Sequence, residues 1–297
     1  MLVPPTPMTW SNRLFIAFVV LTGATAILAQ EPVRFLQMSD PQFGMYTENR
    51  DFAQETANFE FAIATANRLK PRFVIVCGDL VNKAGDADQI AEFHRVAHRL
   101  APGIDLRLVA GNHDVSNTPT RASIDAYRRN FGSDYYTFTY GGFEGIVLDS
   151  SLIQHPEGAP EESARQEKWL EAELATAKQA GARQIVVFQH IPFFVKTADE
   201  ADSYFNLPQA TRSRYLELLK RSGVNYVFSG HLHHAETGQD GALRIFSAGP
   251  VGMPLEGGVS GMRVVEFDAS GVKERYVDFG HLPNKLEEAF APKAEKK

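Results

Sequence analysis

Short apolar runs alternate with longer amphipathic segments along most of the chain. The runs are rich in β-branched and aromatic residues, and runs of this length and composition predict buried β-strands. Five of them end at a cluster of polar residues; they span 35–38, 73–77, 106–110, 185–188 and 226–229.

The amphipathic segments carry apolar residues at helical spacing and charges on the other side, which predicts helices packed on a sheet. They span 52–69, 88–100, 163–180 and 211–222. Further strands are expected at 243–247, 263–267 and 274–278, with a hairpin turn at 268–271. We therefore predict an α/β fold, a four-layer α/β/β/α sandwich of two mixed β-sheets flanked by helices.

Composition narrows the class of protein without naming a reaction. Hydrophobic residues make up 44% of the chain and charged residues 22%, as in ordinary globular proteins. The net charge of -6 argues against nucleic acid as a partner, because such binders carry basic surfaces. Cys77 is the only cysteine, so no intramolecular disulfide is expected.

The first 29 residues differ in kind from the rest. Arg13 precedes the short apolar run 14–21, and Ala24-Thr25-Ala26 offers a small-x-small cleavage site. This layout is typical of a secretory signal peptide. The alternative is an uncleaved membrane anchor, although the run is shorter than the roughly 18–20 residues that a span needs. We predict an exported protein, periplasmic or extracellular, with a membrane partner only if the segment stays uncleaved.

The polar clusters are expected to converge, because sites in α/β sheets form where strands end. Together they hold three carboxylates, three amides and four imidazoles, more than one metal ion needs and about what two would share. The clusters are Asp40-Pro41-Gln42, Gly78-Asp79, Gly111-Asn112-His113-Asp114, Gln189-His190 and Gly230-His231-Leu232-His233.

In this order the motifs D-x-Q, GD, GNHD, QH and GHLH resemble those of the calcineurin-like metallophosphoesterase superfamily. The longer stretches 39–44, 111–120, 187–192 and 204–207 resemble its calcineurin-like phosphoesterase domain-containing protein 1 branch. The resemblance covers a domain at 33–280, followed by a charged tail at 281–297. It implies the four-layer fold and serine/threonine protein phosphatase activity.

Such a site would hold two divalent ions (manganese, iron or zinc) that activate a bridging water and clamp the phosphoryl oxygens. We predict that Asp79 bridges them, since a carboxylate directly after a strand-ending glycine can face both. His231 and His233 alternate along an extended segment and so point the same way. The first ion would take Asp40 and His233, and the second Asn112, His190 and His231.

Two positions near the ions have open roles. The superfamily's D-x-H pattern usually supplies a histidine where this chain has Gln42, whose amide oxygen either ligates an ion or binds a ligand water. His113 is the candidate general acid and, with Asn112, a candidate substrate-binding residue. Asp114 either orients His113 for catalysis or caps a turn.

We predict hydrolysis of phosphate monoesters, with a phosphorylated small molecule or a phosphoprotein as substrate. A small molecule suits an exported protein better, because phosphoproteins are mostly cytosolic. The alternatives are a phosphodiesterase or nucleotide pyrophosphatase on the same metals, and a non-catalytic binding protein that retains the fold. Aromatic residues beside the motifs, from Phe43 and Tyr46 to Tyr204 and Phe205, either line the cleft or belong to the core.

Overall fold

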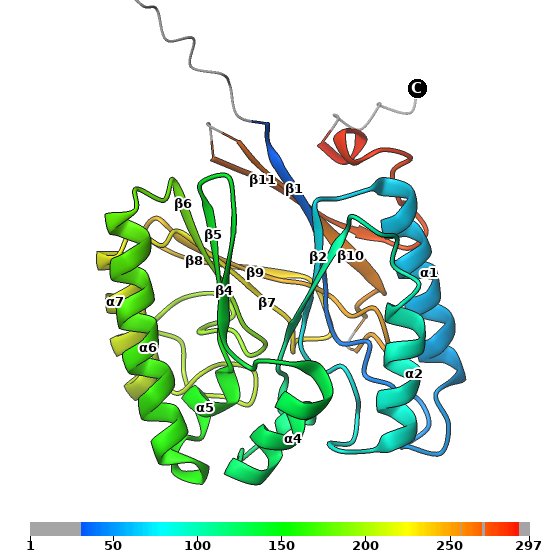
Figure 1. Cartoon of the computed structure of the whole chain (residues 1–297), viewed down its shortest axis with the longest axis horizontal. Coiled ribbons are helices and arrows are strands. Elements are labelled where there is room, and N and C mark those ends of the chain that lie inside the picture. The colour runs from blue at the N-terminus through cyan, green and yellow to red at the C-terminus, as the bar shows by residue number, and fades with distance from the viewer. Residues whose placement is uncertain (1–30, 256, 269–270, 291–297) are drawn as a thin grey trace, which may run out of the picture. The chain divides into compact units, whose positions relative to one another are not determined.

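The computed structural model describes residues 31–255, 257–268 and 271–290. The predicted leader at 1–29 lies outside the described residues. Within them, two β-sheets lie between two pairs of helices, with α1 and α2 on one outer side and α6 and α7 on the other (Figure 1). This is the expected four-layer α/β/β/α sandwich.

Both sheets are mixed. The first has the order β11-β10-β1-β2-β3, in which β1, β2 and β3 are parallel and β10 pairs antiparallel with both β1 and β11. Its strands are β1 (Val33–Met38), β2 (Phe73–Cys77), β3 (Asp105–Val109), β10 (Gly261–Asp268) and β11 (Gly271–Asp278). The register pairs Asp268 with Gly271, which agrees with the expected hairpin.

The second sheet has the order β4-β5-β6-β7-β9-β8, with a parallel centre and an antiparallel strand at each edge. Its strands are β4 (Tyr136–Tyr140), β5 (Phe143–Val147), β6 (Gln184–Phe188), β7 (Tyr226–Ser229), β8 (Glu236–Asp240) and β9 (Leu243–Ser247). The apolar pattern did not predict β4, β5 or β8. The β4–β5 turn is Gly141-Gly142, a hairpin signal that the apolar runs alone do not show.

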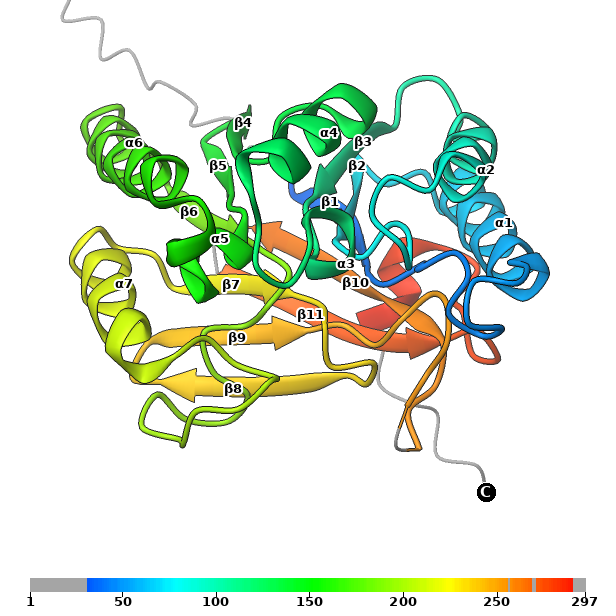
Figure 2. The same ribbon diagram turned by 90° about the horizontal axis from the view of Figure 1, so that it is seen from below.

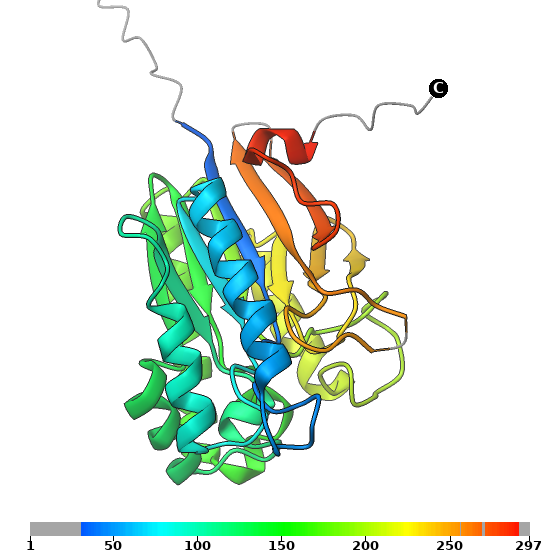
Figure 3. The ribbon, with the colours of Figure 1, turned by 90° about the vertical axis from the view of Figure 1, so that its right-hand side faces the viewer.

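The four expected helices form, with ends shifted by a few residues. They are α1 (Ala53–Leu69), α2 (Ala87–Ala97), α6 (Pro160–Gln179) and α7 (Gln209–Arg221). Figure 3 shows α1 and α2 covering the outer face of the first sheet. Three short helices, α3 (Asn112–Val115), α4 (Arg121–Phe131) and α5 (Ser150–Gln154), lie in the connections near the strand ends (Figure 2).

The packed part of the chain extends past the expected domain end at residue 280. The 3₁₀-helix η2 (Leu286–Phe290) contacts β11 and buries Leu286 and Ala289 against the core under α1. The expected charged tail at 281–297 therefore begins with a packed segment, and residues 291–297 lie outside the described residues.

Three apolar layers separate the four layers of secondary structure. Successive residues of β1 show how, because side chains alternate along a strand: Phe35 faces the opposite sheet, and Leu36 faces α1 and α2. The layer between the sheets is strongly aromatic and includes Phe73, Phe143, Phe188, Phe228, Phe246 and Phe267. Among the described residues, none of the helices is both long and apolar enough to cross a bilayer.

Phe35 is the centre of this aromatic layer. Its ring is fully buried and stacks on Phe73 at 4.6 Å between centroids, while Phe188 and Phe228 of the other sheet present their edges at 5.7 and 5.4 Å. Such rings contribute both buried area and specific geometry.

We expect Phe35→Ala to lower the free energy of unfolding by about 3–5 kcal/mol, because it removes buried apolar area and leaves a cavity between the sheets. Urea denaturation measures this. Phe61→Ala is the control, since Phe61 is 46% exposed on α1 and should cost about 1 kcal/mol or less. Equal losses for the two variants would contradict the central role of Phe35.

Candidate metal centre

Both sheets contribute to one buried polar cluster at the C-terminal ends of their parallel strands. Asp40 and Gln42 follow β1, Asp79 follows β2, Asn112 begins α3 after β3, and His190 follows β6. His231 and His233 follow β7. All seven predicted ligands are at least 95% buried. Neither sheet holds the set alone.

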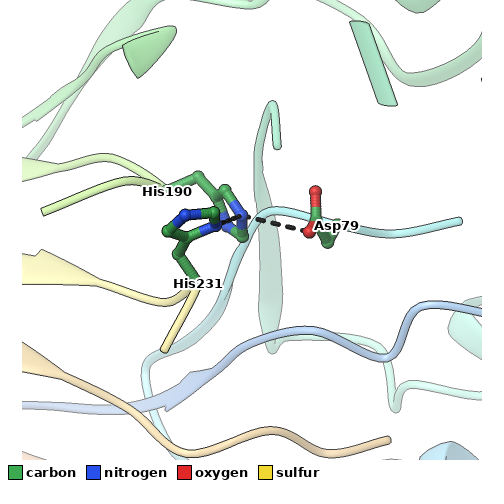
Figure 4. A group of neighbouring side chains, drawn as sticks. All are labelled: Asp79, His190 and His231. Atoms are coloured by element: carbon green, nitrogen blue, oxygen red, sulfur yellow. Dashed lines mark hydrogen bonds and ion pairs between the residues drawn. The ribbon is translucent and has the colours of Figure 1, made fainter. Parts of the chain in front are cut away.

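Ligand atoms from the two sheets lie close together. His190 Nε2 lies 3.1 Å from Asp79 Oδ2 and 3.2 Å from His231 Nδ1 (Figure 4). The possible ligand atoms of these three residues all lie within 4.8 Å of one another. On the other side of the cluster, His233 Nε2 lies 3.6 Å from Asp40 Oδ1.

The backbone is unusual at these positions. Asp40, Gln42, Asp79, His231 and His233 all have positive φ, between 41° and 73°, which non-glycine residues rarely adopt. Backbone conformations of this kind cost energy and cluster at functional sites.

Two glycines permit the chain segments to approach closely. A Cβ on Gly111 would lie 2.1 Å from the Asp79 amide nitrogen, and one on Gly230 would lie 1.7 Å from Ser39 Oγ. The glycines of the GNHD and GHLH motifs therefore let the loops that carry the ligands meet.

Each ring is oriented by a backbone carbonyl. His190 Nδ1 bonds Cys77 O at 2.7 Å, His231 Nε2 bonds Tyr204 O at 2.9 Å, and His233 Nδ1 bonds Met253 O at 2.6 Å. A carbonyl only accepts, so these nitrogens carry hydrogen and the other nitrogen of each ring is left to bind a cation. Metal-ligating histidines are held in this way.

Three of the predicted ligands have a buried acceptor oxygen without a hydrogen-bond partner among the described residues: Asp40 Oδ1, Gln42 Oε1 and Asn112 Oδ1. The amide nitrogens of Gln42 and Asn112 do have partners, which orients both oxygens: Gln42 Nε2 donates to Asn82 Oδ1 at 3.1 Å and Asn112 Nδ2 to Asn117 Oδ1 at 2.8 Å. Buried unpaired acceptors are costly unless a cation binds them. The donor set therefore fits divalent ions.

The close packing of charged groups shifts the pKa values of three predicted ligands, Asp79, His190 and His231. Burial raises the pKa of Asp79, but the adjacent His190 outweighs it and the net pKa is well below the usual range. Burial lowers the pKa of His190, yet Asp79 raises it to about 9. Burial and the His190 charge lower the pKa of His231 to about 3. The proton that His190 and Asp79 share is one that a bound cation would displace.

Asp114 bonds backbone amides and does not orient the His113 ring, the catalytic role considered for it. Its carboxylate accepts hydrogen bonds from the amides of Leu80 at 2.9 Å, Val81 at 3.1 Å and Gly111 at 2.8 Å. It ties the loop after β2 to the loop after β3, so the turn-stabilising alternative describes it better. Burial, together with the Asp79 charge, raises its pKa to about 7.

The orienting partner of His113 is instead Asn82, whose carbonyl oxygen lies 2.8 Å from Nδ1. No sequence pattern pointed to Asn82, whose side-chain oxygen also accepts the hydrogen bond from Gln42 Nε2. It stands three residues after Asp79, but an asparagine in a loop carries no signal by itself. No pattern pointed to the carbonyls of Cys77, Tyr204 and Met253 either. Every residue has a backbone carbonyl, so residue identity does not mark the ones that orient ligands.

The aromatic residues beside the motifs divide into two groups. Phe43, Phe193 and Phe194 are fully buried core residues, whereas Tyr46, Tyr204 and Phe205 are 37–54% exposed. Tyr204 and Phe205 lie against His231, with ring centroids at 4.8 and 6.1 Å. Only the second group can line a cleft.

Comparison with known proteins gives the family of the chain. The family model described as calcineurin-like phosphoesterase matches residues 33–235. The human serine/threonine-protein phosphatase CPPED1 is 34% identical over 270 residues, which cover 86% of this chain and 86% of that protein.

Two solved structures share the fold at lower identity. A dimetal phosphatase from Danio rerio is 17% identical with a TM-score of 0.56, covering 84% of this chain and all of that one. A purple acid phosphatase from yellow lupin is 14% identical with a TM-score of 0.64, covering 84% of this chain and 52% of that one. The family model covers most of the described domain, and the chain belongs to the calcineurin-like phosphoesterase family.

Proposed function

We propose that the protein is a dinuclear-metal phosphatase that hydrolyses phosphate monoesters. One observation carries this: unpaired acceptor oxygens and carbonyl-oriented imidazoles converge in a buried cluster built from both sheets. Membership of a phosphoesterase family supports the same chemistry. The alternative of another class is a non-catalytic binding protein that retains the fold.

The residues divide naturally between two ions. Asp40 and His233 would hold the first, and the unpaired Gln42 Oε1 either ligates it directly or accepts a hydrogen bond from a ligand water. Asp79 would lie between the ions. Asn112, His190 and His231 would hold the second. A mixed nitrogen and oxygen set without thiolates suits manganese, iron or zinc.

When bound, two such ions would lower the pKa of a water and neutralise charge on the phosphoryl oxygens. The chain itself would protonate the leaving group. His113 holds a hydrogen on Nδ1 for the Asn82 carbonyl, so the acid would be the imidazolium form of the ring, which donates its second hydrogen, on Nε2, to the leaving oxygen. Its backbone amide donates to Asp79 Oδ1 at 2.9 Å, which ties the acid to the bridging carboxylate.

The similarity to CPPED1 makes phosphoserine and phosphothreonine in proteins candidate substrates. A small phosphomonoester is the candidate if the protein is exported. A phosphodiester or a nucleotide pyrophosphate on the same metals is the competing hypothesis, and it is separable by assay.

We expect protein stripped of metal to be inactive and to regain hydrolysis of 4-nitrophenyl phosphate on addition of manganese, iron or zinc. Bis(4-nitrophenyl) phosphate should be a poorer substrate, since a monoester presents more charge to two cations. The measurement is kcat/KM for each ester and each metal. A preference for the diester would favour a phosphodiesterase, and no turnover with any metal would contradict the proposal.

Asp79→Asn should abolish hydrolysis and lower the metal content, because a neutral amide cannot hold two cations together. Elemental analysis of the purified variant gives metal per chain. Asp88→Asn, at an exposed position on α2, is the matched control and should retain both properties. Two retained ions with near-normal turnover would remove Asp79 as the bridge.

His113→Ala should slow turnover by roughly 10²–10⁴-fold, the usual range for loss of a general acid, while metal content stays unchanged. The loss should be smaller for 4-nitrophenyl phosphate than for an alkyl phosphate, because nitrophenolate needs little protonation. His98→Ala, at an exposed helix end, is the control. An equal loss on both esters would mean that His113 only positions the phosphate.

We further propose that the mature protein begins near residues 27–30 and lies outside the cytoplasm. The support is the charged start, the short apolar run and the Ala24-Thr25-Ala26 site. Edman sequencing of protein recovered from fractions of its native host should give that new N-terminus. An intact Met1 in the membrane fraction would favour an anchor, and an intact Met1 in the cytosol would contradict export.

A further inference from the structure

A loop between β6 and α7 reaches the metal centre from outside the five motifs. We call residues 199–206 the Tyr204 arm. It has no regular secondary structure apart from turns, yet it brings Tyr204 onto two of the predicted ligands. Because the arm lacks the hydrogen bonds of a helix or strand, other contacts must fix its conformation.

The arm is fixed from within by two side chains. The Glu200 carboxylate accepts hydrogen bonds from the amides of Val195 at 2.6 Å and Lys196 at 2.8 Å, and from Asn206 Nδ2 at 2.7 Å. Asn206 Nδ2 also donates to Ala201 O at 2.9 Å. These bonds fold the arm back on its own start.

A buried guanidinium binds the backbone of the arm and of the segment that precedes it. Arg212 of α7 is fully buried and donates to the backbone carbonyls of Phe193, at 3.3 Å, and Glu200. The carboxylates of Glu200 and Asp202 lie 3.9 Å from it and balance its charge. Because a buried charge must be compensated, the guanidinium fixes the arm in this one arrangement.

Tyr204 has two contacts with the metal centre. Its carbonyl oxygen accepts from His231 Nε2 at 2.9 Å, and its hydroxyl oxygen accepts from Asn112 Nδ2 at 3.2 Å. The Tyr204 hydroxyl proton has no acceptor in the described part of the chain.

The hydrogen-bond count at Asn112 matters for phosphate binding. Its amide has two hydrogens, and these go to Asn117 Oδ1 and to the Tyr204 hydroxyl. The amide therefore has no hydrogen left for a phosphoryl oxygen, which differs from the substrate-binding role expected for Asn112. The Tyr204 hydroxyl, which accepts one of these hydrogens, is the neighbouring group with a hydrogen to give.

We propose that the Tyr204 hydroxyl donates a hydrogen bond to a phosphoryl oxygen of the substrate, which makes Tyr204 a phosphate-binding residue presented by the arm. This inference rests on the proposed function, because it assumes a phosphate at the metal centre. Tyr204 is 54% exposed, so a substrate can reach it from solvent.

The test is the affinity of manganese-loaded protein for inorganic phosphate, measured by isothermal titration calorimetry. Tyr204→Phe keeps the ring and the backbone carbonyl that holds His231, and removes only the hydroxyl. We expect its phosphate Kd to rise about 10-fold or more, as for loss of a hydrogen bond to a charged group. Its KM for 4-nitrophenyl phosphate should rise likewise, with metal content unchanged.

Tyr226→Phe is the matched control, since it removes the same hydroxyl from a tyrosine at the start of β7, the end of that strand opposite to His231 and His233. Its phosphate Kd should match that of the wild type. An unchanged Kd in Tyr204→Phe would overturn the proposal, and so would a loss of metal in that variant, which would show that Tyr204 only positions Asn112. Wild-type protein that binds phosphate but hydrolyses no ester would overturn the proposed function alone.

Discussion

The aromatic layer between the two sheets holds together a site that neither sheet contains. Asp40 and Asp79 follow strands of one sheet, and His190 and His231 follow strands of the other. Their relative positions depend on how the sheets pack, and close packing in protein interiors leaves little freedom. Phe35, stacked within its own sheet and in edge contact with the other, is a clear case of that constraint.

The fold accepts local costs at this junction. Five predicted ligands have positive φ, and three of the predicted ligands have a buried oxygen without a partner among the described residues. Each ligand histidine bonds a backbone carbonyl through one ring nitrogen and turns its other ring nitrogen toward neighbouring ligand atoms. Each of these features opposes folding by itself. Divalent cations would offset them together, because the same oxygens and nitrogens that are costly when unpaired are ligands once the ions bind.

Outer contacts give the site its orientation, and most come from the backbone. Carbonyls of Cys77, Tyr204 and Met253 hold the three ligand imidazoles, and that of Asn82 holds His113. The Tyr204 carbonyl belongs to an arm that is fixed by a buried arginine, so α7 influences the metal centre although it contributes no ligand. The rings are thereby oriented before any ion binds.

The chain's apolar pattern alone determined the two-sheet α/β architecture, the main helices and the strand ends at which chemistry gathers. Motif order was enough to assemble Asp40, Asp79, Asn112 and the histidines into one expected site, because ligand chemistry demands particular side chains. The pattern did not show β4, β5 or β8, because their sequences YTFTY, FEGIV and ETGQD contain polar residues or glycine and are not continuous apolar runs. Tertiary structure alone decided that Asp114 ties two loops, that Asn112 has no hydrogen for phosphate, and that Tyr204 reaches the site. These depend on backbone carbonyls and hydrogen-bond counts between distant segments, which residue identity does not encode.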